Sequence, residues 1–211
     1  MARNTVPTRA QPEQSAPAIG KRSAGLPREL LDVAAQAFSE QGYVAASLNG
    51  IAERFGVLKG SLYHYINSKD DLLFAIIRDS HEWATANNVR WRSEDDPLRA
   101  IALFVEDHIR TALDNVVYTL VYTREYRRLS TERRRQLTAK RSAYERDLRN
   151  LIAAAKKHGE VRADVDPKLA TLAIFGLVNW VYAWHGTDGF DEDDIVVQLR
   201  RQALALLTAP D

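Results

Sequence analysis

The chain of 211 residues contains no cysteine and only one methionine. The absence of thiols excludes disulfide bonds, thiolate zinc sites and thiol redox switches. Long apolar runs are missing as well. The most apolar stretch, residues 169–184, has 16 residues and includes Asn179, whereas a helix needs about 20 to span a bilayer. We therefore expect a protein of the reducing cytoplasm with no membrane partner.

Charge of one sign is also scarce. The formal net charge is +1, and residues 1–66 carry seven basic against five acidic side chains, so composition alone does not indicate nucleic acid. Residues 1–25 are rich in Ala, Pro, Ser, Gln and Arg and show no apolar periodicity and no hydrophobic signal-peptide region. We expect a disordered tail there. Its basic residues either contact DNA phosphates or form a passive extension.

Signatures of enzymes are absent from the sequence. There is no phosphate-binding glycine loop and no Gly-x-Ser-x-Gly motif. The histidines share no metal-ligand spacing; they are His64, His81, His108, His158 and His185. We therefore expect no catalytic residues, no metal and no cofactor.

Residues 46–69, with the sequence ASLNGIAERFGVLKGSLYHYINSK, have the pattern of a helix-turn-helix. Ile51, Ala52 and Phe55 give a first helix one apolar face, and the small Ala52 lets a second helix cross close by. Gly56 can adopt the left-handed conformation that ends a helix and starts a tight turn. Leu62 then faces inward on the second helix. The pattern predicts a DNA-binding unit.

The flanking sequence extends this unit to three helices. Residues 28–41 carry an amphipathic stripe and are followed by Gly42, which is typical of a helix end. Ser68 is a candidate N-cap, with Asp70 and Asp71 in the first turn where the helix dipole favours acids. We therefore divide the chain into a tail (residues 1–25), a DNA-binding head (residues 26–70) and a larger domain (residues 71–211).

At these positions the chain resembles the TetR family of bacterial transcriptional regulators. The resemblance covers about a quarter of the chain and depends on a set of small, apolar and capping residues: Ala34, Phe38, Gly42, Tyr43, Ser47, Ile51, Ala52, Gly56, Val57, Gly60, Ser61, Leu62, Tyr63, Tyr65, Ser68, Lys69 and Leu72. It implies a homodimer that binds palindromic double-stranded operator DNA through two heads.

The residues that we expect to contact DNA lie around the second helix of the motif. They are Ser47, Asn49, Lys59, Gly60, Ser61, Tyr63, His64 and Lys69. Lys59 can reach guanine in the major groove, and Gly60 lets the backbone approach the bases. Tyr63, His64 and Lys69 are expected to contact phosphates. For each of these residues, the alternative is an ordinary solvated surface side chain.

The remainder of the sequence has helical periodicity. Helices are expected over residues 97–113, 118–129, 131–158, 169–184 and 195–206, so the whole chain is predicted to be all-α with about nine helices. The run 169–184 is apolar on all sides, which predicts complete burial. The last two helices resemble the pair through which TetR-type regulators dimerise. The dimer contacts expected on that basis are Leu177, Val178, Val181, Leu199, Ala203 and Leu206.

A basic stretch and a group of aromatic residues suggest an effector site. Residues 124–149 hold ten basic and four acidic side chains. The segments 122–129 and 176–184 loosely resemble TetR-type repressors of fatty-acid, phenylacetate and steroid breakdown, which respond to acyl-CoA thioesters. The implied ligand-binding residues are Phe104, His108, Tyr122, Arg124, Tyr126, Arg127, Arg128, Trp180 and Trp184. A solvated basic face, a generic hydrophobic effector and no effector remain alternatives.

These observations favour a repressor that a small molecule releases from its operator. The alternative from another class is a helical small-molecule-binding protein, or an enzyme, without DNA function.

Overall fold

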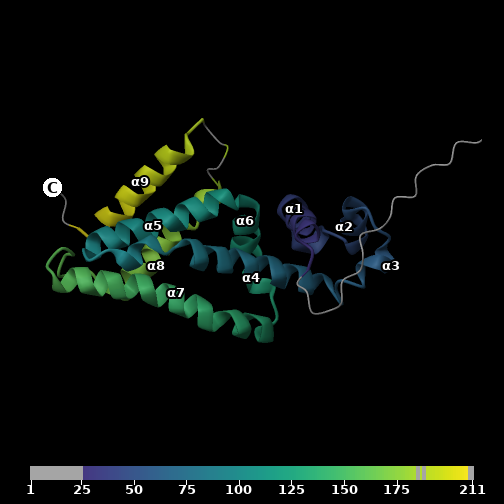
Figure 1. Cartoon of the computed structure of the whole chain (residues 1–211), viewed down its shortest axis with the longest axis horizontal. Coiled ribbons are helices and arrows are strands. Elements are labelled where there is room, and N and C mark those ends of the chain that lie inside the picture. Colours follow the sequence, from purple (N-terminus) through teal and green to yellow (C-terminus); the bar gives the residue numbers. More distant parts are fainter. Residues whose placement is uncertain (1–25, 184–185, 187–188, 209–211) are drawn as a thin grey trace, which may run out of the picture.

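The computed structural model describes residues 26–183, 186 and 189–208. Within these ranges the chain is helical and has no strand, as predicted (Figure 1). The elements are α1 (Arg28–Ala45), α2 (Leu48–Phe55), α3 (Lys59–Leu62), α4 (Lys69–Asn87), η1 (Arg90–Ser93), α5 (Pro97–Asp114), α6 (Val116–Glu125), η2 (Tyr126–Arg128), α7 (Thr131–Lys157), α8 (Pro167–Val178), η3 (Val181–Ala183) and α9 (Glu192–Ala205). The predicted tail and Trp184 lie outside the described residues.

Helices α1, α2 and α3 form a head at one end of the molecule (Figure 1). Gly42 has φ 78° and breaks the regular helix of α1, and Gly56 has φ 80° and closes α2. The Ser47 hydroxyl accepts a hydrogen bond from the Gly50 amide at 3.0 Å, which caps α2. The stops at both glycines and the cap agree with the sequence-based predictions.

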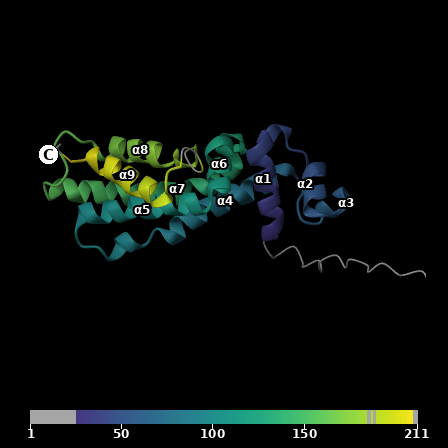
Figure 2. The same cartoon turned by 90° about the horizontal axis from the view of Figure 1, so that it is seen from above.

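Helix α4 joins the head to the body (Figures 1 and 2). Its first turn is held by a capping box, in which Asp71 accepts hydrogen bonds from the backbone amides of Asn67 and Ser68. Leu72 and Ile76 are fully buried in the core that α4 shares with α1. Ala84, near the other end, packs against the core of the body. One continuous helix therefore connects the two cores.

The body consists of α5 to α9, and α5 packs against α4, α7 and α9. Both α5 and α8 begin at an Asp-Pro pair. Asp96 caps α5, and Asp166 caps α8 by accepting from the Leu169 amide at 2.8 Å. Helix α6 lies next to the head (Figure 1), where the Tyr118 hydroxyl donates to Asp32 of α1 at 2.8 Å.

The apolar run 169–184 is not one fully buried helix, as the sequence had suggested. Helix α8 ends at Val178, Asn179 is its C-cap, and η3 follows. Leu169 is 66% exposed and Trp180 is 52% exposed. The prediction was wrong because the helix ends at Val178 and because α8 packs against α5, α7 and α9 but has no helix of the protomer over Leu169. The expected helix 118–129 likewise divides into α6 and η2, and Ser130 caps α7 by accepting from the Arg133 amide.

The residues expected at a dimer interface lie mostly inside the protomer. Val178, Val181, Leu199 and Ala203 are at most 2% exposed and belong to the core of the body. Leu177 is half-buried, and only Leu206 is exposed. Val178 on α8, Val181 in η3, and Leu199 and Ala203 on α9 all face the core of the body, so these four side chains are covered by the protomer itself.

Candidate DNA-binding surface and effector cavity

The second helix of the motif presents its predicted outer face to solvent. Lys59, Gly60, Tyr63 and His64 are exposed, and Leu62 is fully buried beneath them. Ser61 is half-buried, and both Ser47 and Asn49 at the start of α2 are exposed. The orientation arises because Leu62 anchors this short helix in the head core. Seven of the eight expected DNA contacts thus lie together around α2 and α3.

Lys69 differs from the expectation of a free phosphate contact. Its Nζ donates to the carbonyl oxygens of Tyr43 (2.6 Å), Val44 (3.2 Å) and Ala46 (2.9 Å), and it lies 4.4 Å from the centre of the Tyr43 ring. The ammonium group therefore satisfies the carbonyls that the break at Gly42 leaves without helical partners. Its role is to hold the turn between α1 and α2 against α4.

The same turn is held from the body by Glu125, the last residue of α6. This carboxylate is 8% exposed; one oxygen accepts from the Tyr43 amide at 3.3 Å, and the other accepts from Arg128 Nε. The turn from residue 43 to residue 46 is thus fixed by α4 and α6 together. Arg128, expected at an effector site, is instead the partner of Glu125.

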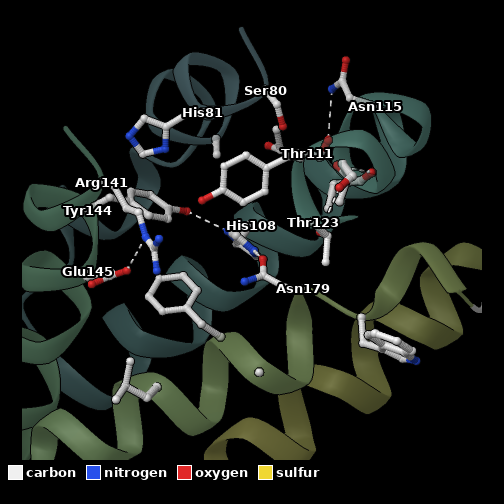
Figure 3. Close-up of a pocket in the computed structure, with 18 residues that line it drawn as sticks. Ser80, His81, His108, Thr111, Asn115, Thr123, Arg141, Tyr144, Glu145 and Asn179 are labelled. Carbon is white, nitrogen blue, oxygen red and sulfur yellow. Dashed lines mark hydrogen bonds and ion pairs between the residues drawn. The ribbon is translucent and has the colours of Figure 1, made fainter. Parts of the chain in front are cut away.

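A cavity of about 350 Å³ lies between α4, α5, α6, α7 and α8 (Figure 3). Its lining combines hydroxyl, amide, aromatic and aliphatic groups: Ser80, His81, Ala84, His108, Thr111, Ala112, Asn115, Thr119, Tyr122, Thr123, Arg141, Tyr144, Glu145, Leu172, Phe175, Gly176, Asn179 and Trp180. The volume is at the lower end of the range of about 300 to 1,000 Å³ for small-molecule sites.

Only part of the predicted effector site lies at this cavity. His108, Tyr122 and Trp180 line it. Phe104 does not, because it is a core residue, 1% exposed, whose ring centre lies 4.9 Å from that of Tyr144. The remaining described candidates, Arg124, Tyr126, Arg127 and Arg128, are not part of the lining.

These residues have other partners: Tyr126 packs against the cavity residues Tyr122 and Arg141 from outside the lining, and Arg128 pairs with Glu125. Arg124 lies over the Tyr182 ring at 5.8 Å instead. The guanidinium that does line the cavity belongs to Arg141 of α7, whose Nε donates to Glu145 at 2.8 Å. Basic and acidic residues are mixed along α7, so the sequence did not show which of its arginines faces the cavity.

A chain of hydrogen bonds crosses the wall of the cavity. Asn88 Nδ2 donates to the Phe104 carbonyl at 2.8 Å and to the Tyr144 hydroxyl at 2.7 Å. Tyr144 lies 3.0 Å from His108 Nδ1, and His108 Nε2 lies 3.0 Å from Asn179 Oδ1. Figure 3 shows Tyr144, His108 and Asn179 side by side. Neither Tyr144 nor Asn179 was predicted from the sequence.

Burial lowers the pKa of His108 from 6.5 to about 4, so the ring is neutral at pH 7. In the unfolded chain the ring binds a proton below pH 6.5, whereas the folded protein resists protonation until about pH 4. The free energy of unfolding should therefore fall by about 3 kcal/mol as the pH decreases through this window. Urea titrations at several pH values should show that the free energy of unfolding depends less on pH in His108→Gln than in the unaltered protein. Identical dependence in both proteins would contradict a neutral, buried His108.

Known families match both parts of this chain, the helix-turn-helix head and the body that contains the cavity. Residues 30–76 match the family described as bacterial regulatory proteins, tetR family, and residues 94–207 match the family described as tetracyclin repressor-like, C-terminal domain. The chain belongs to the tetR family. The resemblance inferred from the motif is thereby confirmed, and the protein is a DNA-binding transcriptional regulator. The alternative without DNA function is not favoured.

Similar curated proteins include regulators of lipid metabolism. The fatty acid metabolism regulator protein of Bacillus subtilis (strain 168) is 23% identical over 156 residues, covering 72% of this chain and 78% of that protein. The HTH-type transcriptional repressor KstR2 of Rhodococcus jostii (strain RHA1) is 28% identical over 150 residues, covering 67% of this chain and 71% of that protein.

Two solved structures are also similar to this chain. The regulator PfmR from Thermus thermophilus has a TM-score of 0.75 at 27% identity, covering 83% of this chain and 96% of that one. AibR, solved in complex with isovaleryl coenzyme A and operator DNA, has a TM-score of 0.76 at 25% identity, covering 87% of this chain and 98% of that one.

Two further features are absent from the part of the chain that the structure describes. None of the helices there is both long and apolar enough to cross a membrane. The same part of the chain contains no group of His, Cys, Asp and Glu side chains placed to hold a metal ion.

Proposed function

We propose that this tetR-family protein is a dimeric repressor of a palindromic operator and that an acyl-CoA thioester releases it from DNA. The observation that carries the proposal is the cavity beside α4, because the same helix ends in the DNA-binding head. A ligand at one end of α4 can therefore alter the position of the head at the other end.

The DNA contacts proposed are the exposed residues around α2 and α3. Lys59 is placed to meet a base edge, and Tyr63 and His64 to meet phosphates. Ser47 and Asn49 lie at the N-terminus of α2, where backbone amides attract a phosphate. Lys69 contributes by holding the head together. The head, residues 26–70, and the body, residues 71–211, act as separate functional units in this scheme.

Dimerisation is proposed to use the uncovered apolar side of α8 and α9. Leu169 is exposed at the start of α8, as are Val197 and Leu206 on α9 and at its end. An apolar stripe of this kind is typical of a protein interface. A two-fold partner supplies the second head that a palindromic site needs.

The effector is proposed to place its acyl group in the cavity and its nucleotide outside. The cavity is too small for a whole CoA ester, but Leu172 and Trp180 are both exposed and part of its lining, which places an opening beside α8. Arg141 supplies a cation at the wall. Regulators similar to this chain include one solved with isovaleryl coenzyme A and one named for fatty acid metabolism.

Release requires that the effector bind the DNA-free arrangement of the heads more tightly than the DNA-bound one. Helix α6 offers a second route besides α4. It contributes Tyr122 to the cavity and ends at Glu125, which holds the turn at Tyr43. A displacement of α6 by an acyl group would therefore move the turn that positions α2.

Calorimetric titration tests the effector class. Acyl-CoA thioesters of several chain lengths and the matching free acids are titrated against the full chain. Charge-assisted phosphate contacts are worth about 1.5 to 3 kcal/mol each, so the thioesters should bind at least about tenfold more tightly than the acids. Equal binding of acids and thioesters, or no binding of either, would contradict the proposal.

A further inference from the structure

One arrangement of protons leaves no buried N–H or O–H of Asn88, Tyr144 and His108 without an acceptor, although the buried Asn88 Oδ1 has no partner among the described residues. The starting point is the Phe104 carbonyl, which can only accept, so the side-chain group of Asn88 that lies 2.8 Å away must be its NH2 group. The reversed amide would place two acceptor oxygens against each other. The same NH2 group then donates to the Tyr144 oxygen at 2.7 Å.

This first step fixes the next two. The Tyr144 oxygen accepts from Asn88, and His108 Nδ1 is the one other polar atom described beside it. A buried O–H without an acceptor is costly, so the Tyr144 hydroxyl donates to His108 Nδ1. Burial depresses the pKa of His108, so the ring is neutral and carries a single proton, which must lie on Nε2. That N–H donates to Asn179 Oδ1.

The chain ends at the Asn179 amide, whose oxygen is committed to His108. Its NH2 group consequently points elsewhere, and no partner for it occurs among the described residues. The nitrogen is also not one of the buried atoms left without a partner, so it is accessible where Asn179 lines the cavity (Figure 3). The Asn179 NH2 group is therefore a hydrogen-bond donor at the cavity, and the hydrogen bonds of Asn88, Tyr144 and His108 determine its orientation.

We propose that the Asn179 NH2 group binds the acyl carbonyl oxygen of the effector, so that the protein recognises thioesters through a donor oriented by Tyr144 and His108. This inference rests on the proposed function, because it assigns the part of an acyl-CoA that enters the cavity. A carbonyl suits the site because it only accepts, and the apolar side chains of Ala112, Leu172 and Phe175 are available to the acyl chain.

The assignment also connects the effector to the head. Asn88 is the C-cap of α4, and it is linked to Asn179 through Tyr144 and His108 by three successive hydrogen bonds. A carbonyl that accepts a hydrogen bond from Asn179 is therefore linked through this chain to α4, the helix that carries the head at its other end.

The test compares thioesters with thioethers in which a CH2 group replaces the carbonyl: isovaleryl-CoA against S-isopentyl-CoA, and decanoyl-CoA against S-decyl-CoA. Affinities are measured by calorimetry. In the unaltered protein the thioester should bind about tenfold more tightly than its thioether, since the thioether leaves the donor unpaired. Asn179→Asp is the matched variant, because it keeps the acceptor for His108 and replaces the donor with an anion. It should lose the preference.

Tyr144→Phe tests the orienting chain separately. It removes the hydroxyl that fixes the His108 proton, so the Asn179 amide can reverse, and the thioester preference should shrink although Asn179 is unchanged. Operator binding without effector controls for the fold of both variants.

Thioesters and thioethers that bind the unaltered protein equally well would overturn the inference and leave the proposed effector class intact. A full preference retained in Asn179→Asp would overturn it too. A full preference in Tyr144→Phe would overturn the orienting role of Tyr144 and His108. Failure of all four ligands to bind would overturn the proposed effector class, and the inference with it.

Discussion

Replacement of Leu169 and Val197 by Asp should convert the protein into folded monomers that bind the operator at least about a hundredfold more weakly. Leu169 is 66% exposed on α8 and Val197 is 47% exposed on α9, so neither substitution disturbs the protomer core. Burying a carboxylate in an apolar dimer interface is costly. A monomer also loses the gain in affinity, commonly about 10² to 10⁴, that comes from joining two binding units.

Val89→Asp is the matched control, because Val89 is another exposed apolar residue, 41% exposed, outside α8 and α9. Light scattering should report monomers for the double variant and dimers for the control. Fluorescence anisotropy should show weakened operator binding for the double variant and unchanged binding for the control. A double variant that remains dimeric with unchanged affinity would place the interface on another surface.

Lys69→Met and Lys59→Met should weaken operator binding for different reasons. Lys69 donates to three carbonyls at the turn between α1 and α2, and hydrogen bonds from charged groups are worth about 1.5 to 3 kcal/mol. Its loss should lower the free energy of unfolding by about 2 kcal/mol and misplace α2. Lys59 is exposed on the outer face, so its loss should leave stability unchanged.

The salt dependence of operator binding separates the two lysines. A lysine whose charge lies at the DNA surface, at a phosphate or at a base edge between the two rows of phosphates, displaces condensed counterions and contributes up to about one unit to the slope of log affinity against log salt concentration. We expect the slope per head to fall by about one in Lys59→Met and to stay constant in Lys69→Met. The opposite pattern, with a reduced slope and unchanged stability for Lys69→Met, would show that the Lys69 ammonium contacts DNA.

The head could be predicted from the sequence because its signals are local. Gly42 and Gly56 mark conformations that cost other residues free energy, and Ser47 caps a helix three residues ahead of the amide that it binds. Such signals depend only on neighbours along the chain. Lys69 was misinterpreted because its partners, at residues 43 to 46, lie more than twenty positions away.

The effector cavity could be predicted only in part because its wall is assembled from five helices. His108, Tyr122 and Trp180, which the resemblance implied as ligand-binding residues, line this cavity. Asn179 and Tyr144 act through side chains from other helices, and no spacing within one helix reveals that contact. The dimer residues were misplaced for a related reason: an all-apolar run does not show which of its sides the protomer covers.

The most direct test of the account is an anisotropy titration of the full chain against labelled DNA from upstream of its own gene, with and without acyl-CoA. We predict saturable binding to that DNA, much weaker binding to a scrambled sequence of equal length, and release by isovaleryl-CoA or a longer acyl-CoA but not by CoA alone. Equal binding to both DNA sequences, or a specific complex that no acyl-CoA dissociates, would contradict the account of an effector-released repressor.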